Sequence, residues 1–149
     1  KALDGNYEEA QALYTEALKF NPDMFQAYFS RGLIRMKLGD VVGAVSDFAE
    51  TTRICPSFRG GYVQKGLAYE ILGQPEKAFK AFDQAVRYDS QNPEALFHFA
   101  RFLERDGNFT EALEMYNKAT GLRPKQELDR LIGERITAIR SRQAVDSKR

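Results

Sequence analysis

The chain has 149 residues, with 22 Lys and Arg against 21 Asp and Glu, which leaves a net charge of +1. This balance argues against a nucleic-acid-binding module, which normally presents a strongly basic face. Apolar residues make up 43% of the chain, and no apolar run approaches the roughly 20 residues of a membrane-spanning helix. With one cysteine, Cys55, and one histidine, His98, an internal disulfide and a Cys-based zinc site are excluded. We therefore expect a cytoplasmic protein without a catalytic, cofactor or metal site, and without a nucleic-acid or membrane partner.

Residue types that recur every 34 positions indicate a repeat architecture. Each period begins with a glycine, followed by an alanine, an aromatic residue and a small residue at fixed distances. The glycines are Gly5, Gly39, Gly73 and Gly107, and the alanines are Ala10, Ala44, Ala78 and Ala112. The aromatic residues are Tyr14, Phe48, Phe82 and Tyr116, and the small residues are Ala17, Thr51, Ala85 and Ala119.

Each period is expected to contain two antiparallel helices joined by a short turn. In the second period, apolar residues at three-to-four spacing predict a helix over 41–54, preceded by a helix over 25–38. Gly39 is expected to adopt the left-handed conformation that ends the first helix, and Asp40 to cap the second. Ala44 is small where a neighbouring helix must approach closely, and Phe48 fills the adjoining space.

The first period is expected to be incomplete. Lys1 falls inside the first helix of that repeat, so residues 1–24 supply only half a repeat, and we expect the chain to be a fragment of a longer protein. Its apolar residues should then lack part of their cover. They are Tyr7, Ala10, Tyr14 and Leu18.

At the other end, residues 125–143 are predicted to form one unpaired helix that caps the last repeat. Its basic outer face could instead contact an acidic partner or a membrane surface. Residues 144–149 are expected to fray. The apolar stripe consists of Leu128, Leu131, Ile132, Ile136 and Ile139.

The pattern resembles the tetratricopeptide repeat (TPR). The second repeat matches that family with Tyr28, Gly32, Ala44, Phe48 and Pro56, and the third with Tyr62, Gly66, Tyr69, Ala78, Phe82 and Ala85. The fourth matches with Ala100, Ala112, Tyr116, Ala119 and Pro124. Departures are the absence of tryptophan, Arg35 in place of a tyrosine, and Ser90 in place of the closing proline, with Pro93 expected in the first turn of the next helix.

The resemblance implies an all-α fold: a right-handed α-solenoid of antiparallel helix pairs, with about eight helices. The TPR array would span residues 1–124, as a half repeat 1–24 followed by full repeats at approximately 25–58, 59–92 and 93–126. In this family, first-helix residues line a concave groove. Carried over to this chain, the groove residues are Gln26, Phe29, Ser30, Leu33, Met36, Lys37, Val63, Gln64, Leu67, Ile71, Phe97, His98, Arg101 and Arg105.

Two ligand-binding modes of the family do not fit these positions. The clamp for chaperone tails needs Lys, Asn and Arg, whereas the matching places here hold Phe29, Leu33, Gln64, Glu94 and His98. A ladder of asparagines is likewise absent. The remaining pattern, an apolar track with a polar edge, suits an amphipathic helix or an extended peptide. Alternatively, Val63, Leu67 and Phe97 pack against their own second helices, and the array is a spacer.

The sequence therefore predicts a protein–protein interaction module whose partner is another protein. One alternative is an assembly scaffold that self-associates or stacks with other repeat proteins. Another is a recognition arm on an enzyme whose catalytic domain lies outside these residues.

Overall fold

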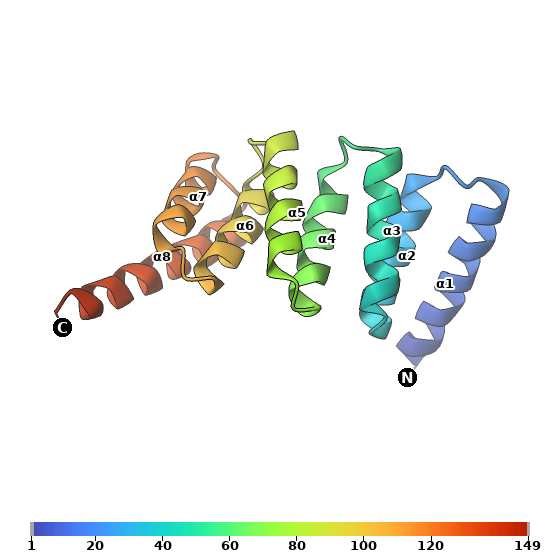
Figure 1. Cartoon of the computed structure of the whole chain (residues 1–149), viewed down its shortest axis with the longest axis horizontal. Coiled ribbons are helices and arrows are strands. Elements are labelled where there is room, and N and C mark those ends of the chain that lie inside the picture. The colour runs from blue at the N-terminus through green and yellow to red at the C-terminus, as the bar shows by residue number, and fades with distance from the viewer. Residues whose placement is uncertain (1, 149) are drawn as a thin grey trace. The chain divides into compact units, whose positions relative to one another are not determined.

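The computed structural model describes residues 2–148, which form eight α-helices and no strand (Figure 1). The predicted all-α fold with about eight helices is confirmed. The chain divides into two compact units, one ending at Tyr88 and the other beginning at Asp89. The helices are α1 (Ala2–Phe20), α2 (Phe25–Leu38), α3 (Val41–Ile54), α4 (Arg59–Ile71), α5 (Pro75–Tyr88), α6 (Pro93–Arg105), α7 (Phe109–Gly121) and α8 (Gln126–Ser147).

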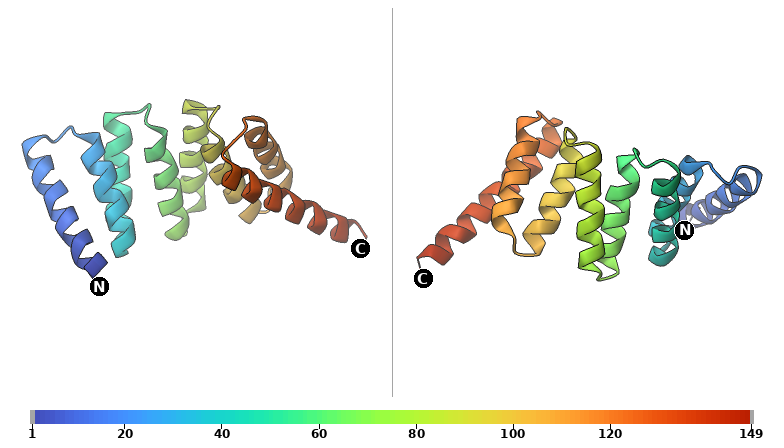
Figure 2. Two further views of the ribbon diagram at one scale, coloured as in Figure 1. Left: turned by 180° about the vertical axis from the view of Figure 1, so that it is seen from behind. Right: turned by 45° about the horizontal axis from the view of Figure 1, so that its top comes forward.

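In the first unit, helices α1 to α5 lie side by side in chain order, as the front and rear views show (Figures 1 and 2). The helices α2 and α3 form one antiparallel pair, and α4 and α5 form a second. Contacts between α1 and α2 and between α3 and α4 join these elements into one stack. The unit is thus built from the helix pairs that the 34-residue period predicts.

Glycines and caps end the helices where the repeat columns place them. Gly39, Gly73 and Gly107 have φ angles of 86°, 70° and 86°, in the left-handed region that favours glycine. The Asp40 side chain caps α3, because its Oδ1 accepts the Gly43 N–H at 3.0 Å. Pro93 is the first residue of α6, as predicted.

In the first unit, the core of each of the pairs α2–α3 and α4–α5 contains a close approach between a glycine and a phenylalanine. A Cβ atom added to Gly32 would lie 2.6 Å from the Phe48 ring, and one added to Gly66 would lie 2.8 Å from the Phe82 ring. Both rings are fully buried. The two repeat columns are therefore coupled, because the large ring occupies the space that the missing side chain leaves.

The N-terminal helix differs from the prediction. No turn occurs at Gly5, and α1 runs without interruption from Ala2 to Phe20. A glycine inside a helix costs only about 1 kcal/mol, so a glycine at this repeat position does not by itself require a turn. Of the residues expected to lack cover, Leu18 is buried, and Tyr7, Ala10 and Tyr14 are half-buried. Lys1 lies outside the described residues.

In the second unit, α6 and α7 form a helix pair, and α8 packs against α7. Ile132 and Ile139 of the predicted stripe are buried, while Leu128, Leu131 and Ile136 are half-buried. α8 continues to Ser147, so residues 144–147, which we expected to fray, are helical; residue 149 lies outside the described range. Within residues 2–148, no helix combines the length and the hydrophobicity that crossing a membrane requires.

Candidate protein-interaction surface

The first unit carries most of the predicted groove residues, on the first helices of two successive repeats. These helices, α2 and α4, contact each other, so their rows of side chains lie side by side. The residues on α2 are Gln26, Phe29, Ser30, Leu33, Met36 and Lys37, and those on α4 are Val63, Gln64, Leu67 and Ile71.

Phe29 links this surface to the core beneath it. Its ring makes an edge-on contact with Phe58 at 4.9 Å between centroids and a tilted contact with Phe48 at 5.9 Å. Leu33 and Met36 pack against the same buried cluster, which contains Phe48. All three side chains remain half-buried, so each keeps some surface in contact with solvent.

The predicted residues on α4 differ strongly in exposure. Val63 is only 9% exposed and belongs mainly to the core. Ile71 is 63% exposed, although it is a large hydrophobic residue. Gln64 and Leu67 are half-buried between these extremes. Packing in the core thus accounts for Val63, whereas most of the Ile71 side chain is exposed apolar surface.

The predicted residues of the second unit, Phe97, His98, Arg101 and Arg105, all lie on α6. Phe97 is 8% exposed, and its ring lies 6.1 Å from that of Tyr116 on α7. The Arg101 guanidinium lies 5.8 Å from the Phe97 ring centroid. Arg105 is exposed. Phe97 is thus a core residue of the α6–α7 pair, with a cationic side chain over its ring.

His98 is half-buried on α6. Burial lowers its pKa below the ordinary value, the charge of Arg101 lowers it further, and Glu94 only partly opposes them. Its Nδ1 atom is buried and has no hydrogen-bond partner among the described residues. Within residues 2–148, no group of three or more His, Cys, Asp and Glu side chains is placed to hold a metal ion.

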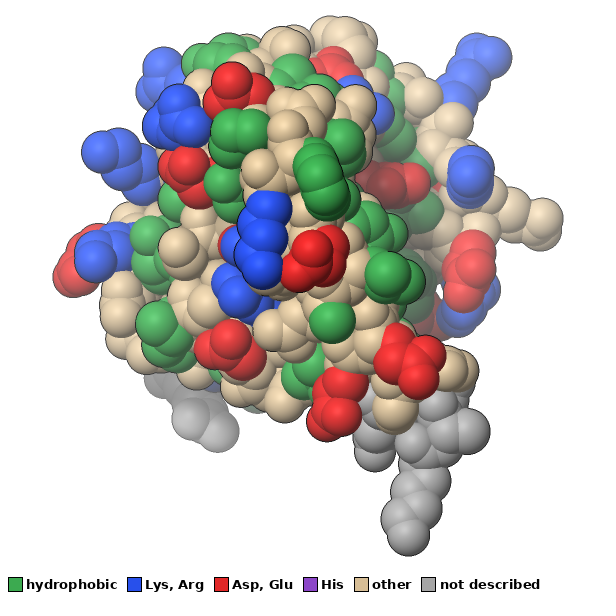
Figure 3. All heavy atoms as spheres, turned by 90° about the vertical axis from the view of Figure 1, so that its right-hand side faces the viewer, with side chains coloured by type: hydrophobic (Ala, Val, Ile, Leu, Met, Phe, Trp, Pro, Cys, Tyr) green, Lys and Arg blue, Asp and Glu red, His purple; other side chains and the backbone are tan. Residues whose placement is uncertain are grey.

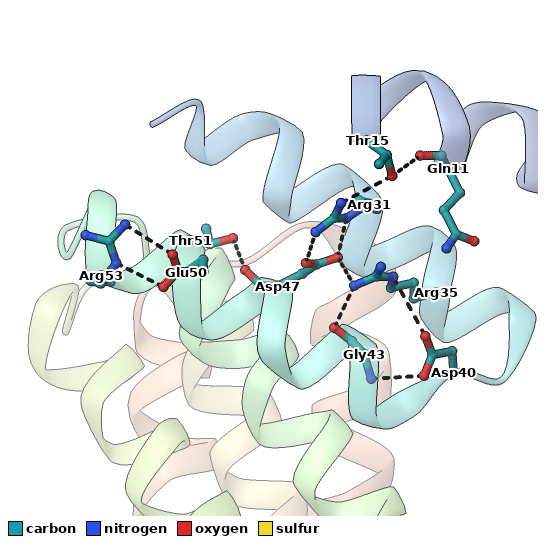
Figure 4. A network of polar contacts seen from close by, with 10 residues as sticks. All are labelled: Gln11, Thr15, Arg31, Arg35, Asp40, Gly43, Asp47, Glu50, Thr51 and Arg53. Carbon is teal, nitrogen blue, oxygen red and sulfur yellow. Dashed lines mark hydrogen bonds and ion pairs between the residues drawn. The ribbon is translucent and has the colours of Figure 1, made fainter. Parts of the chain in front are cut away.

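A buried ionic network ties α1, α2 and α3 together, and sequence reasoning missed it (Figure 4). Asp47 is 2% exposed and accepts two hydrogen bonds from Arg31, from Nε at 2.9 Å and from Nη2 at 2.7 Å. Arg35 Nη1 donates to the same carboxylate at 3.1 Å. Arg31 Nη1 also reaches Thr15 Oγ1 on α1 at 3.2 Å. The hydrogen bond with Asp47 raises the pKa of Arg31, although burial opposes it.

The family model for the tetratricopeptide repeat matches residues 4–57 and 63–127. The Hsp70-Hsp90 organizing protein 3 of Arabidopsis thaliana is 31% identical over 99 residues, which are 66% of this chain and 18% of that protein. The TPR repeat-containing protein YpiA of Bacillus subtilis is 28% identical over 123 residues, which are 83% of this chain and 29% of that protein. The chain therefore spans less than a third of either relative.

Solved structures show the same fold. MamA 41-end from Desulfovibrio magneticus RS-1 is 26% identical, with a TM-score of 0.73 over 84% of this chain and 71% of that one. The Yersinia enterocolitica type III secretion chaperone SycD, in complex with a peptide of the translocator YopD, is 19% identical, with a TM-score of 0.74 over 81% of this chain and 95% of that one. These likenesses confirm the predicted class of α-solenoid. The helix pairs, the coupled Gly and Phe columns and the family match together show that the chain belongs to the tetratricopeptide repeat family of protein-interaction modules.

Proposed function

We propose that this module binds a peptide or an amphipathic helix of a partner protein along the first-helix surface formed by α2 and α4. The observations that support this proposal are the exposed Ile71 on α4 and the half-buried Phe29, Leu33 and Met36 on α2, a helix that contacts α4. Gln64 adds a half-buried amide, which can donate and accept hydrogen bonds of a peptide backbone. An apolar track with a polar edge fits apolar anchors spaced along a helix or an extended segment.

Ile71 is the strongest candidate anchor on this surface. Full burial of such a side chain contributes about 1.5–3 kcal/mol. With 63% of its surface exposed, Ile71 has most of that contribution still to gain on binding. Phe29, Leu33 and Met36 are already half-buried, so each gains less. The expected partner therefore places its principal apolar side chain near the C-terminal end of α4.

The carboxylate clamp for chaperone tails is not part of the proposal, although Hsp70-Hsp90 organizing proteins are among the relatives. Phe29 and Leu33 occupy two of the clamp places and cannot donate hydrogen bonds to a carboxylate. Glu94, at a third place, would repel it. The SycD complex provides an example of a peptide held on this fold.

Self-association is the second candidate, and α1 carries the observation that favours it. Phe20 is 88% exposed and Leu13 is 70% exposed. The space-filling view that faces the α1 end shows hydrophobic side chains among charges of both signs (Figure 3). Exposed large hydrophobic residues on one helix are typical of a surface that another protein covers. A recognition arm on a larger enzyme stays a third alternative, because the chain spans only part of its relatives' length.

The test is a capture experiment from cell extract with the parent chain, an Ile71→Glu variant and a Val42→Glu control. Val42 is 69% exposed and lies on α3, outside the predicted groove, so the control changes the same kind of surface. We expect proteins that bind the parent and the control to be lost from Ile71→Glu, with all three chains equally helical by circular dichroism. Capture that is unchanged by Ile71→Glu would contradict the proposal.

The self-association alternative has its own measurement. Sedimentation equilibrium should then show a mass that rises with concentration for the parent, and a monomer mass for a Phe20→Glu variant. A monomer mass for the parent at every concentration would exclude it.

A further inference from the structure

A pocket of about 330 Å³ lies on the α4–α5 pair, apart from all of the predicted groove residues. Three lysines line it: Lys65 from α4, and Lys77 and Lys80 from α5. Among the residues that the structure describes, none of these lysines forms an ion pair with a carboxylate. The remaining lining residues are Tyr69, Ala81 and Gln84.

The same place in the preceding repeat shows what this pocket lacks. Thirty-four residues earlier, Arg31 stands at the place of Lys65, and Asp47 stands at the place of Ala81. In that repeat the buried Asp47 carboxylate neutralises Arg31 through two hydrogen bonds. The third repeat keeps a cation on the first helix and adds two more on the second, where Gly43 and Ser46 are replaced by Lys77 and Lys80. The carboxylate itself is gone.

The three lysines line one pocket, in which Lys77 and Lys80 are exposed and Lys65 is more deeply placed. Lys65 is half-buried, with its Nζ 5.5 Å from the centroid of the Tyr62 ring, while Lys77 Nζ lies 5.8 Å from that of Tyr69. Burial lowers the pKa of Lys65 below its ordinary value, and the charge of Lys80 lowers it further. Both causes disfavour the charged ammonium, and an anion in the pocket would offset both.

We propose that this pocket binds a compact, multiply charged anion of the phosphate class, which takes the place that Asp47 fills in the preceding repeat. Three ammonium groups, one from each lysine, supply the charge. Tyr69 and Gln84 line the same pocket, and their side chains carry neutral hydrogen-bond donors.

The residue types favour a phosphate group over a lone carboxylate. A single carboxylate carries one charge and is best held by the planar fork of an arginine, which this pocket does not contain. A phosphate group carries about 1.5 to 2 negative charges near neutral pH and three acceptor oxygens. Lysines act as point charges, so a cluster of them suits a compact polyanion without a preferred plane.

Isothermal titration calorimetry of the 149-residue chain at low ionic strength tests the proposal, with inorganic phosphate, pyrophosphate, and a phosphoserine peptide together with its unphosphorylated form as probes. We expect saturable binding that weakens at least about tenfold in a Lys65→Met, Lys80→Gln double variant. An Ala81→Asp variant should bind equally weakly, because its carboxylate would occupy the pocket as Asp47 does. A Lys118→Gln variant, which removes an exposed lysine of α7, should bind as the parent does.

Each outcome of these titrations either supports the proposal or overturns it. No saturable binding of either probe or of a phosphoserine peptide would overturn the proposal, as would unchanged binding in folded Ala81→Asp or in the double variant. If Ala81→Asp fails to fold, the double variant decides alone. Binding of the free anions assigns the pocket to a soluble phosphoester; binding of only the phosphoserine peptide, and not of its unphosphorylated form, assigns it to a phosphorylated partner. Protein capture through Ile71 is a separate readout.

Discussion

The hydroxyl of Tyr116 donates a hydrogen bond of 2.9 Å to Glu104, which joins α7 to α6 in the second unit. Arg135 from α8 donates to the same carboxylate, from Nε at 3.1 Å and from a second guanidinium nitrogen. Tyr116 is fully buried, and burial together with the neighbouring Glu104 raises its pKa. One carboxylate thus connects all three helices of this unit.

The charge of Glu104 should make stability depend on acid pH. Burial alone would raise the pKa of Glu104, but the hydrogen bonds from Arg135 and Tyr116 outweigh it, so the pKa lies below its ordinary value of 4.5. A carboxyl whose pKa is lowered by folding adds stability above its unfolded pKa and loses that stability as the pH falls through the folded value. We therefore expect the free energy of unfolding to decrease below about pH 4.5.

A Glu104→Gln variant isolates this contribution. It should be less stable than the parent at pH 7 and should show a shallower loss of stability as the pH falls below about 4.5. Urea unfolding across this range measures both effects. A variant whose pH dependence matches that of the parent would show that Glu104 does not titrate differently on folding.

Removal of Asp47 should destabilise the first unit strongly. Asp47→Ala leaves Arg31 and Arg35 without their buried partner, and loss of one member of a buried ion pair costs about 3–5 kcal/mol. The matched control is Asp83→Ala, which removes an ion pair with Arg87 on the surface of α5 and should cost at most about 1 kcal/mol. Urea unfolding of both variants gives the difference directly. Equal losses would mean that the Asp47 network adds little beyond a surface pair.

The repeat columns predicted the parts of the fold that depend on backbone conformation and side-chain volume. Gly39 adopts its left-handed conformation, Asp40 caps α3, and Ala44 and Phe48 are fully buried. These features follow from residue types at a fixed spacing, because each has one main physical use there. Gly5 shows the limit, since a helix tolerates a glycine and the column alone does not require a turn.

The polar contacts between helices could not be predicted from the sequence. Asp47 and Arg31 are sixteen residues apart in the sequence, and Arg135 and Glu104 are thirty-one apart. Neither pair has the three- or four-residue spacing by which an ion pair within one helix can be predicted. The exposed fraction of each side chain along the predicted groove could not be predicted either. Phe97 looks as accessible as Phe29 by position, yet it packs with Tyr116 and is 8% exposed. The sequence signal for the lysine pocket is the change from Asp47 to Ala81 at the same place in successive repeats, which removes a carboxylate near the cation on the first helix.

The close approach between Gly32 and Phe48 should make Gly32→Ala destabilising. The added Cβ would meet the fully buried Phe48 ring at 2.6 Å, so the ring must move, and overpacking of this kind costs about 1–3 kcal/mol. Gly133→Ala is the control, because its Cβ would meet nothing within 4 Å in α8, and it should stabilise the chain by about 0.5–1 kcal/mol. Thermal unfolding should show a lower melting temperature than the parent's for Gly32→Ala and a higher one for Gly133→Ala. A stabilising Gly32→Ala would refute the packing argument.

Finally, α8 should behave as a structural part of the second unit in its first turns and as a solvated helix towards its end. Ile132 is fully buried, so Ile132→Ala should cost about 2–5 kcal/mol through lost burial and the cavity left behind. Val145 is 56% exposed on the same helix, and Val145→Ala should change stability by less than about 0.5 kcal/mol. Urea unfolding followed by circular dichroism measures both. If Ile132→Ala changed the free energy of unfolding as little as Val145→Ala, α8 would not be a cap that stabilises the last repeat. The alternative role of its basic face, contact with an acidic partner or a membrane surface, would then be favoured.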